Sequence, residues 1–346
     1  MLKRIAVFGA IAATAAAVGA VFPTGAIAAD KQNLRYSQWL PPAHWTQRPL
    51  LHKWYKKVSK ATDGRVNIQP TAKGLGAPPR QYQLARDGIA DVVWVVHGYT
   101  PGSFPLSEMV ELPFITRSGE ANSVAYWRIF KKVLEPAGMH KDVHTLTMFV
   151  HVPGQVYNNK RPINALADFK GLKLRIPNAI VSEALKSLGA VPMSAPVTKL
   201  RDGLAKGVFD GTSLTDEAIY AFKIAKFTKY ATHIPGGLYN VSFSMAMNKA
   251  KWQKIAAKDQ ATVMELAGEA LSREIGRKWD EREAWAPTKL KEDGVVWNTL
   301  EGKALAGLKE KLKHYEARWI EKANKNGIDG AKTIEMYRAE VAGYRS

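Results

Sequence analysis

The stretch Asp168–Asn178, DFKGLKLRIPN, contains the clearest strand pattern of the chain. From Leu172 to Ile176 apolar residues occupy every second position, and Pro177 ends the pattern. This period is typical of a strand with one buried face, so Arg175 lies on the opposite face, near the strand's carboxyl end, where open α/β sheets bind ligands. Its guanidinium group fits a carboxylate or a phosphate. By itself, however, the pattern favours a simpler interpretation, a solvated arginine paired with a surface acid.

Strand and helix patterns alternate on both sides of this stretch. Further strands are expected at Asn33–Trp39, Val66–Gln69, Asp91–Val96, Thr145–Val150, Val156–Asn158 and Tyr239–Met247. Helices are expected at Pro49–Thr62, Gln81–Gly88, Gly119–Leu134, Ile180–Leu188 and Lys199–Lys206. This alternation predicts an α/β fold with at least some parallel strand pairing.

A very long helical pattern begins near Asn248. Apolar residues from Val263 to Ile275 recur at helical spacing, and Pro287 is expected to kink the helix. A second amphipathic helix is predicted at Ala304–Lys325. The first pattern exceeds an ordinary helix in length, which indicates an element that spans two domains.

The amino terminus has the three parts of a secretory signal peptide. Lys3 and Arg4 precede the apolar run Ile5–Phe22, and Ala26-Ile27-Ala28 supplies a small-residue cleavage site. We therefore expect residues 1–28 to be removed by cleavage after Ala28, leaving a protein that is free outside the cytoplasmic membrane. An uncleaved membrane anchor is the alternative.

Composition limits the possible partners. The chain of 346 residues has no cysteine, which excludes disulfides, a thiol nucleophile and thiolate metal sites. Its net charge of +19 suits nucleic acid, an anionic membrane surface or an anionic solute. Export argues against nucleic acid, and the basic residues are spread out rather than clustered in an arm. The charge is thus interpreted as solubility and long-range attraction of anions.

No motif for catalysis, metal or cofactor binding is found. Gly74-Leu75-Gly76 lacks the third glycine of a phosphate loop, and Pro78-Pro79 follows it. His140, His144 and His151 lack an H-E-x-x-H arrangement and an acidic third ligand. The familiar serine and nucleotide signatures are missing as well. We therefore expect no enzyme, no metal and no cofactor.

Aromatic and polar residues at the expected strand ends describe a cleft with apolar walls and one fixed cation, the usual design of a small-anion site. The candidates are Trp39, Trp94, His97, Tyr99, Arg175, Thr212, Ser213 and Tyr239. Each of them, taken singly, is more easily explained as core or rim.

Taken in order, several segments make the chain resemble the periplasmic solute-binding proteins of tripartite ATP-independent periplasmic (TRAP) transporters. They are VSKATDGRV at 58–66, GLG at 74–76, RDGIAD at 86–91, ELPF at 111–114, RPI at 161–163, DFKGLKLR at 168–175, GAVPM at 189–193 and GVFDG at 207–211. The resemblance covers essentially the whole chain after the signal peptide.

The resemblance implies a two-lobed α/β fold with a hinge and a long domain-spanning helix. The first lobe would comprise residues 29–152 with 241–279, and the second residues 153–240 with 280–346. Chain crossings near Val152 and Asn240 would be the hinges. The lobes would close on an organic acid in the periplasm and deliver it to a permease with a small and a large membrane subunit.

The resemblance also implies that Arg175 forms a salt bridge with the ligand carboxylate. Gln155 stands nearest to the position where some family members carry a second ligand-facing arginine, so Arg175 is expected to hold the carboxylate alone. Departures from the family pattern at 197–201 and 212–214 remove polar anchors. Together with Trp39 and Trp94, they favour a less polar carboxylate, whose identity stays open.

Three alternatives remain on the sequence. The protein could supply a sensor or another class of transporter, it could be a secreted hydrolase or lyase acting on an anionic substrate, or it could be a basic structural protein of the periplasm.

Overall fold

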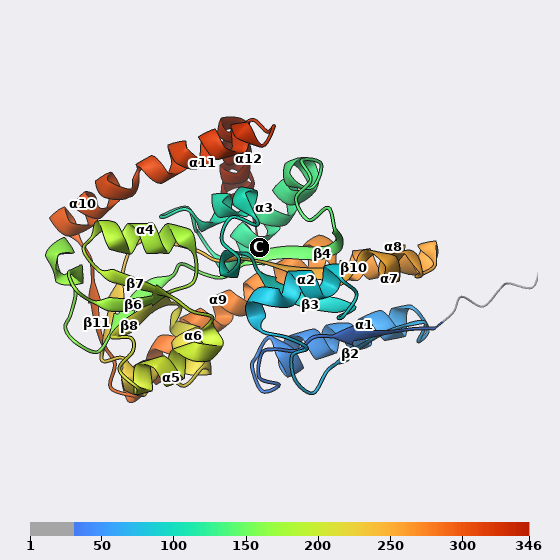
Figure 1. Ribbon diagram of the computed structural model, residues 1–346, viewed down its shortest axis with the longest axis horizontal. Coiled ribbons are helices and arrows are strands. Elements are labelled where there is room, and N and C mark those ends of the chain that lie inside the picture. Colours follow the sequence, from blue (N-terminus) through green and yellow to red (C-terminus); the bar gives the residue numbers. More distant parts are fainter. Residues whose placement is uncertain (1–30, 346) are drawn as a thin grey trace, which may run out of the picture.

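The structure, a computed structural model, describes residues 31–345. The expected signal peptide and its cleavage after Ala28 lie outside the described residues. Two β-sheets stand at the centre of the two halves of the molecule, and helices pack around them (Figure 1). Within 31–345 no helix combines the length and the apolar character needed to cross a membrane.

The first sheet has the strand order β2-β1-β3-β10-β4. Its strands are β1 (Gln32–Tyr36), β2 (Val66–Pro70), β3 (Val92–Val96), β4 (Val143–Val150) and β10 (Ser242–Asn248). β1 pairs in parallel with β2 and β3, which confirms the expected parallel pairing, and β10 runs antiparallel to β3 and β4. Every residue of β3 is buried, as its unbroken apolar run predicts for a central strand.

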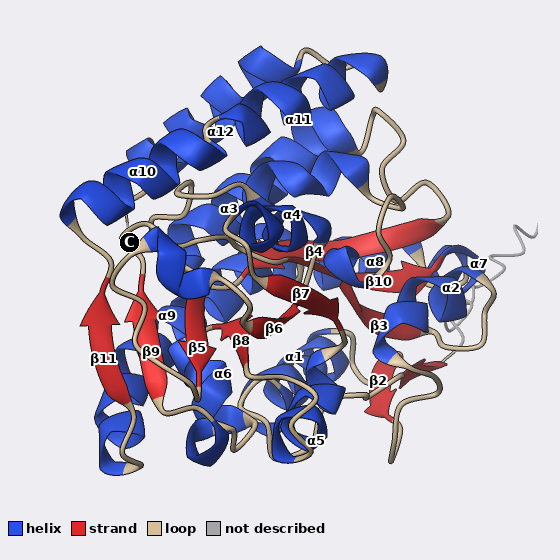
Figure 2. Ribbon diagram, turned by 60° about the vertical axis from the view of Figure 1, so that its left-hand side comes forward, coloured by secondary structure: helices blue, strands red, loops and turns tan. Residues whose placement is uncertain are grey.

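The second sheet has the order β11-β9-β5-β8-β6-β7. Its strands are β5 (Gln155–Asn158), β6 (Lys173–Ile176), β7 (Val191–Ser194), β8 (Gly211–Leu214), β9 (Tyr230–His233) and β11 (Val296–Thr299). β6 is the strand expected from the opening stretch, and it pairs in parallel with β7 and β8. Figure 2 shows the two sheets side by side, with helices on their outer sides.

In the first half, α1 packs on β2, α2 on β3 and α3 on β4. In the second half, α4 packs on β6 and β7. The shorter helices are α1 (His52–Ala61), α2 (Gln81–Arg86), α3 (Gly119–Ile129), α4 (Ala179–Ser187), α5 (Leu200–Ala205) and α6 (Asp216–Ala221). The later ones are α7 (Lys249–Gln253), α8 (Ala257–Leu266), α9 (Gly268–Glu292), α10 (Gly302–Leu312), α11 (His314–Lys325) and α12 (Gly330–Gly343).

The long pattern after Asn248 forms three helices rather than one, namely α7, α8 and α9. The last break falls at Gly268, whose φ of 44° leaves the right-handed helical region. The indole of Trp54 donates to the carbonyl of Leu266 at 2.6 Å, and the hydroxyl of Thr147 to that of Gly268 at 2.7 Å. Other elements thus satisfy backbone groups that the break frees. Pro287 lies inside α9 without ending it.

α9 is the element that connects the two halves. It packs on α3 and β4 of the first half and on α6 of the second. The sequence therefore predicted a spanning helix correctly, although this helix begins at Gly268 and not near Asn248.

The expected helix Ala304–Lys325 is divided into α10 and α11 at Lys313. α12 then packs on α3, where the amide of Asn122 donates to the hydroxyl of Tyr337 at 2.7 Å. The expected division placed all of 280–346 with the second sheet. The contacts of α12 instead place this helix on the first half, because its Tyr337 is buried there.

Two of the chain crossings between the halves lie next to each other. Gly154 and Tyr239 form an isolated antiparallel bridge, with Gly154 N donating to Tyr239 O at 2.9 Å. The crossings sit where the sequence predicts hinges, near Val152 and Asn240. Side chains at these crossings reach the cavity described below.

Candidate binding site

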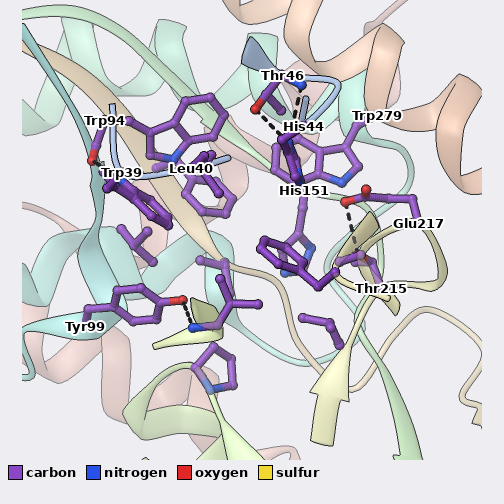
Figure 3. Close-up of a pocket in the computed structure, with 18 of the residues that line it drawn as sticks. Trp39, Leu40, His44, Thr46, Trp94, Tyr99, His151, Thr215, Glu217 and Trp279 are labelled. Atoms are coloured by element: carbon purple, nitrogen blue, oxygen red, sulfur yellow. Dashed lines mark hydrogen bonds between the residues drawn. The ribbon is translucent and has the colours of Figure 1, made fainter. Parts of the chain in front are cut away.

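A cavity of about 70 Å³ lies between the two sheets. By the space that one buried water needs, it has room for roughly five waters. Figure 3 shows aromatic side chains around it, with Tyr99 on one side and Glu217 on the other. The lining comprises Trp39, Leu40, His44, Thr46, Trp94, Val96, Tyr99, His151, Arg175, Pro177, Val197, Leu214, Thr215, Glu217, Ala218, Phe222, Tyr239, Val241, Phe243 and Trp279.

Arg175 supplies the positive charge of the cavity. Leu174 and Ile176, on either side of it in β6, are buried in the core, so the alternation of the strand turns Arg175 to the other face. That face is covered as well, and Arg175 is only 1% exposed. The local interpretation of a solvated surface arginine is therefore wrong, because the first half of the molecule closes over this strand.

The guanidinium group keeps part of its hydrogen-bonding capacity free. Nε donates to the carbonyl of Ala195 at 2.7 Å, and Nη2 donates to the hydroxyl of Tyr99 at 3.2 Å. Within residues 31–345 no acceptor is found for Nη1, and no acidic side chain forms an ion pair with Arg175. A buried cation is costly without a counter-charge, so this arrangement fits an incoming anion.

The walls are formed mainly by packed aromatic rings. Phe243 stacks on Trp279 at a centroid distance of 5.4 Å, and Trp94 meets Phe243 edge-on at 5.7 Å. The indole of Trp39 donates to the carbonyl of Trp94 at 3.0 Å, which fixes its ring at the cavity edge. Such walls suit a flat apolar group and exclude a strongly hydrated one.

Glu217 lies at the other side of the cavity and is 3% exposed. Its Oε2 accepts from the indole of Trp45 at 2.8 Å, and burial raises the pKa of this carboxyl to about 7. His44 lies close by, and burial followed by the charge of Arg282 lowers its pKa to about 4. Near neutral pH this side of the cavity thus carries no imidazolium charge and only part of a carboxylate charge.

Two side chains of the first half reach across to the second. The hydroxyl of Tyr99, which follows β3, accepts from the backbone N–H of Val197 at 2.9 Å as well as from Arg175. The hydrogen bond from Trp45 to Glu217 makes the second link. Both links border the cavity, so the structure holds the two halves closed around it.

Five of the residues expected in the cleft line this cavity, namely Trp39, Trp94, Tyr99, Arg175 and Tyr239. Four others lie elsewhere, namely His97, Gln155, Thr212 and Ser213. The two ring nitrogens of His97 bond to Ser242 and His140, each at 3.0 Å. The side-chain oxygen of Gln155 accepts from the N–H of Ile234 at 2.7 Å. Thr212 and Ser213 belong to β8 and are buried in the second sheet.

Sequence reasoning did not single out His44, Glu217, Phe243 or Trp279 for the site, and it considered His151 only as a metal ligand. Trp279 comes from the middle of α9, where its helical spacing indicates only a buried face. His151 directly follows β4 at an expected hinge, and this position is the one signal that pointed toward the cleft. In the part of the chain that the structure describes, no group of three or more histidines and acids could hold a metal ion.

The sequence model of the family described as bacterial extracellular solute-binding protein, family 7, matches residues 36–322. Among solved structures, a TRAP periplasmic solute-binding protein from Bordetella bronchiseptica with bound (R)- and (S)-mandelate is 32% identical to this chain. That match covers 90% of this chain and 99% of the other, with a TM-score of 0.87.

Two further solved structures are similar over nearly the same length. One is a marine metagenome TRAP solute-binding protein specific for aromatic acid ligands, in complex with 3-hydroxybenzoate. It is 32% identical, with 92% of this chain and 100% of the other covered and a TM-score of 0.85. The other, from Rhodoferax ferrireducens with copurified benzoate, is 30% identical, with coverages of 90% and 98% and a TM-score of 0.83.

Proposed function

The chain belongs to family 7 of the bacterial extracellular solute-binding proteins, the receptors of TRAP transporters, and from this we propose that it captures an aromatic monocarboxylate. The acid would lie in the cavity between the two halves, with its carboxylate on Arg175 and its ring among Trp94, Phe243 and Trp279. The single observation that carries this proposal is the buried guanidinium of Arg175, which has no acidic partner in residues 31–345 and opens on an aromatic-walled cavity.

The relatives support the same class of ligand. Mandelate, 3-hydroxybenzoate and benzoate, named with the three similar structures, each combine one carboxylate with one aromatic ring. Gln155, the position nearest to a second family arginine, is occupied by its bond from Ile234. One cationic anchor with apolar walls favours a monocarboxylate over a dicarboxylate.

Rough magnitudes indicate that both the charge contact and the burial of the ring contribute to the binding free energy. An arginine–carboxylate contact near 4 Å is worth about 4 kcal/mol gross at an effective dielectric of about 20. Burying about 150 Å² of an aromatic ring contributes about another 4 kcal/mol. Micromolar binding needs about 8 kcal/mol net, which the two contributions together reach only before the costs of association are subtracted. Neither contribution alone is sufficient, so both the carboxylate and the ring are required.

Calorimetry with matched ligands tests the proposal. Benzoate and phenylacetate should bind, whereas benzamide and benzyl alcohol, which lack the charge, and acetate, which lacks the ring, should bind at least about a hundredfold more weakly. Equal binding of benzamide, or no binding of any aromatic acid, would overturn it. A ligand recovered unchanged after overnight incubation would separate a receptor from a hydrolase or lyase.

We further propose that the protein works in the periplasm and delivers the acid to a small and a large permease subunit. The expected cleavage after Ala28 is checked by the amino-terminal sequence of the protein recovered from a periplasmic extract. Co-purification of the loaded protein with both permease subunits tests the transport role. Capture by a sensor instead would favour the alternative that it supplies a signalling protein.

A further inference from the structure

An unsatisfied nitrogen atom of His151 lies buried at the cavity. The imidazole ring is in contact with Tyr239, Trp279 and Phe243, at centroid distances of 5.4, 5.9 and 6.0 Å. Its Nε2 is buried, and within 31–345 no group is placed to bond to it. Buried polar atoms nearly always have a partner, so a lone acceptor or donor in a binding cavity points to the chemistry of what binds.

The other ring nitrogen determines what Nε2 can do. Nδ1 forms a hydrogen bond with the backbone carbonyl of Val152, and because a carbonyl only accepts, the proton must be on Nδ1. Burial is the main reason that the pKa of His151 falls to about 4, so the ring is neutral near pH 7. Nε2 then presents a bare lone pair. A carboxylate, which also only accepts, cannot satisfy it.

The groups around His151 place this acceptor beside the anion anchor. Arg175, His151 and Tyr239 line the same cavity. Burial lowers the pKa of His151 and raises the pKa of Tyr239, and the positive charge of Arg175 has a smaller, lowering effect on both. The hydroxyl of Tyr239 is buried, lines the cavity and has no partner in the described chain. Arg175 and Tyr239 thus offer donors for a carboxylate, and His151 offers an acceptor next to them.

We propose that the cavity is built for an aryl-substituted 2-hydroxy acid, whose hydroxyl donates to Nε2 of His151 while its carboxylate accepts from Arg175 and Tyr239. This inference rests on the proposed function and makes it more specific. A hydroxyl on the carbon next to the carboxylate is the shortest way to place a donor beside an anion. A ligand without it would bury the lone pair of His151 unpaired.

The first test compares mandelate with phenylacetate, which differ only in the 2-hydroxyl group, by calorimetry at pH 7.5. The wild-type protein should bind mandelate at least about tenfold more tightly, because loss of the hydroxyl leaves a buried acceptor unsatisfied. In His151→Phe this preference should disappear while phenylacetate still binds. His151→Gln, which keeps an acceptor, should retain part of the preference. His144→Phe, remote from the cavity and stacked on Trp252, is the matched control and should behave like the wild type.

A second measurement uses only the wild-type protein, so its result does not depend on whether a variant folds. In protein labelled with ¹⁵N-histidine, the Nε2 resonance of His151 should shift on adding mandelate as a nitrogen lone pair does when it accepts a hydrogen bond. Phenylacetate should leave it at the position of a free lone pair. The same resonance position with both acids would overturn the inference, and would mean that water or nothing meets Nε2.

The outcomes separate this inference from the proposed function. Equal affinity of the wild-type protein for mandelate and phenylacetate would overturn the role of His151 and leave the proposed function intact. If His151 increased the affinity for 3-hydroxyphenylacetate but not for mandelate, the hydroxyl that it recognises would lie on the ring. That result would overturn the inference that the ligand is a 2-hydroxy acid. Failure of all three acids and of benzoate to bind would instead overturn the proposed function.

Discussion

Arg175 is the residue on which the proposed site depends. Its neighbours in β6 determine only which face of the strand it occupies, whereas its burial and its free Nη1 come from elements elsewhere in the chain. Ala195, in the same half, orients the guanidinium group before a ligand arrives, and Tyr99 adds a second hydrogen bond when the halves are closed. This preorganisation reduces the entropy that is lost on binding.

Arg175→Lys should weaken the binding of benzoate at least about tenfold, because the ammonium group keeps the charge but loses the planar fork. Isothermal calorimetry at constant ionic strength measures the change. Arg201→Lys, on the exposed face of α5, is the matched control and should leave affinity unchanged. An unaltered affinity of Arg175→Lys would exclude Arg175 as the carboxylate anchor.

Glu217 should make the stability of the protein depend on pH. Because burial raises its pKa from 4.5 to about 7, the folded chain holds a proton that the unfolded chain releases in this window. Stability contributed by this group is therefore present below about pH 4.5 and falls as pH rises to about 7. The groups that face it are Arg282, whose charge lowers this pKa, and the buried Glu283 nearby.

Glu217→Gln should remove this contribution. The variant should match the wild type near pH 5 and gain up to about 3 kcal/mol relative to it at pH 8, as measured by urea unfolding without ligand. Comparison of the two proteins cancels the contributions of other buried acids. Glu310→Gln, at an exposed ion pair, controls for loss of a surface charge. Parallel pH profiles for Glu217→Gln and the wild type would show that Glu217 does not titrate in this range.

At the scale of elements, α9 carries the connection between the halves. Asp280 accepts from the backbone N–H groups of Gly119 and Glu120 at the start of α3, at 2.6 and 2.9 Å. Glu283, one turn later, accepts in the same way from Asp216 and Glu217 at the start of α6, at 3.0 and 2.9 Å. One helix thus supplies side-chain caps to a helix in each half and satisfies free N–H groups at both helix amino termini.

Close packing of α9 on α3 depends on Gly276. A Cβ at this position would lie 2.4 Å from the carbonyl oxygen of Gly119, far inside van der Waals contact with backbone. Gly276→Ala should therefore destabilise the protein by about 2 kcal/mol or more, although alanine is the better helix former. Chemical denaturation measures the loss.

Gly343→Ala is the matched control, because a Cβ there meets nothing within 4 Å and Gly343 ends α12. It should be neutral or slightly stabilising. Equal stabilities of the Gly276→Ala and Gly343→Ala variants would contradict the proposed role of Gly276 in holding α9 against α3.

At the scale of the whole molecule, two links close the halves over the cavity, one through Tyr99 and one through Trp45 and Glu217. We propose that the halves open by rotation at the crossings near Val152 and Asn240. In this proposal residues 31–152 with 241–279 move against 153–240 with 280–312. α11 and α12 move with the first group, because α11 packs on Pro105–Glu111 and α12 packs on α3. Opening would break both links and admit the ligand.

Tyr99→Phe should speed ligand release, because the N–H of Val197 and Nη2 of Arg175 both lose their acceptor in the closed state. We expect the dissociation rate measured by stopped flow to rise about tenfold, with little change in the association rate. Tyr220→Phe, exposed on α6, is the control. An unchanged dissociation rate would mean that Tyr99 does not hold the halves together.

The sequence by itself determined which segments form the longer helices and strands and which of their residues turn inward. The alternation around Arg175, the unbroken apolar run of β3 and the helical spacing of α9 each predict an element, because side chains on one face of an element must share one environment. Among the four-residue strands β5 and β6 were predicted, whereas β7 and β11 were not, since in these two strands buried and exposed residues do not alternate. The break at Gly268 was missed because backbone contacts from distant residues stabilise it.

Only the tertiary structure decided which of the candidate residues meet. Trp39, Trp94, Arg175 and Tyr239 line one cavity, while His97 and Gln155 are occupied by partners far away in the sequence. His151 and Glu217 joined the site because a hinge segment and the start of α6 are brought to the same space. Local periodicity tells which way a side chain points from its own element. What it meets depends on how two sheets and one connecting helix pack.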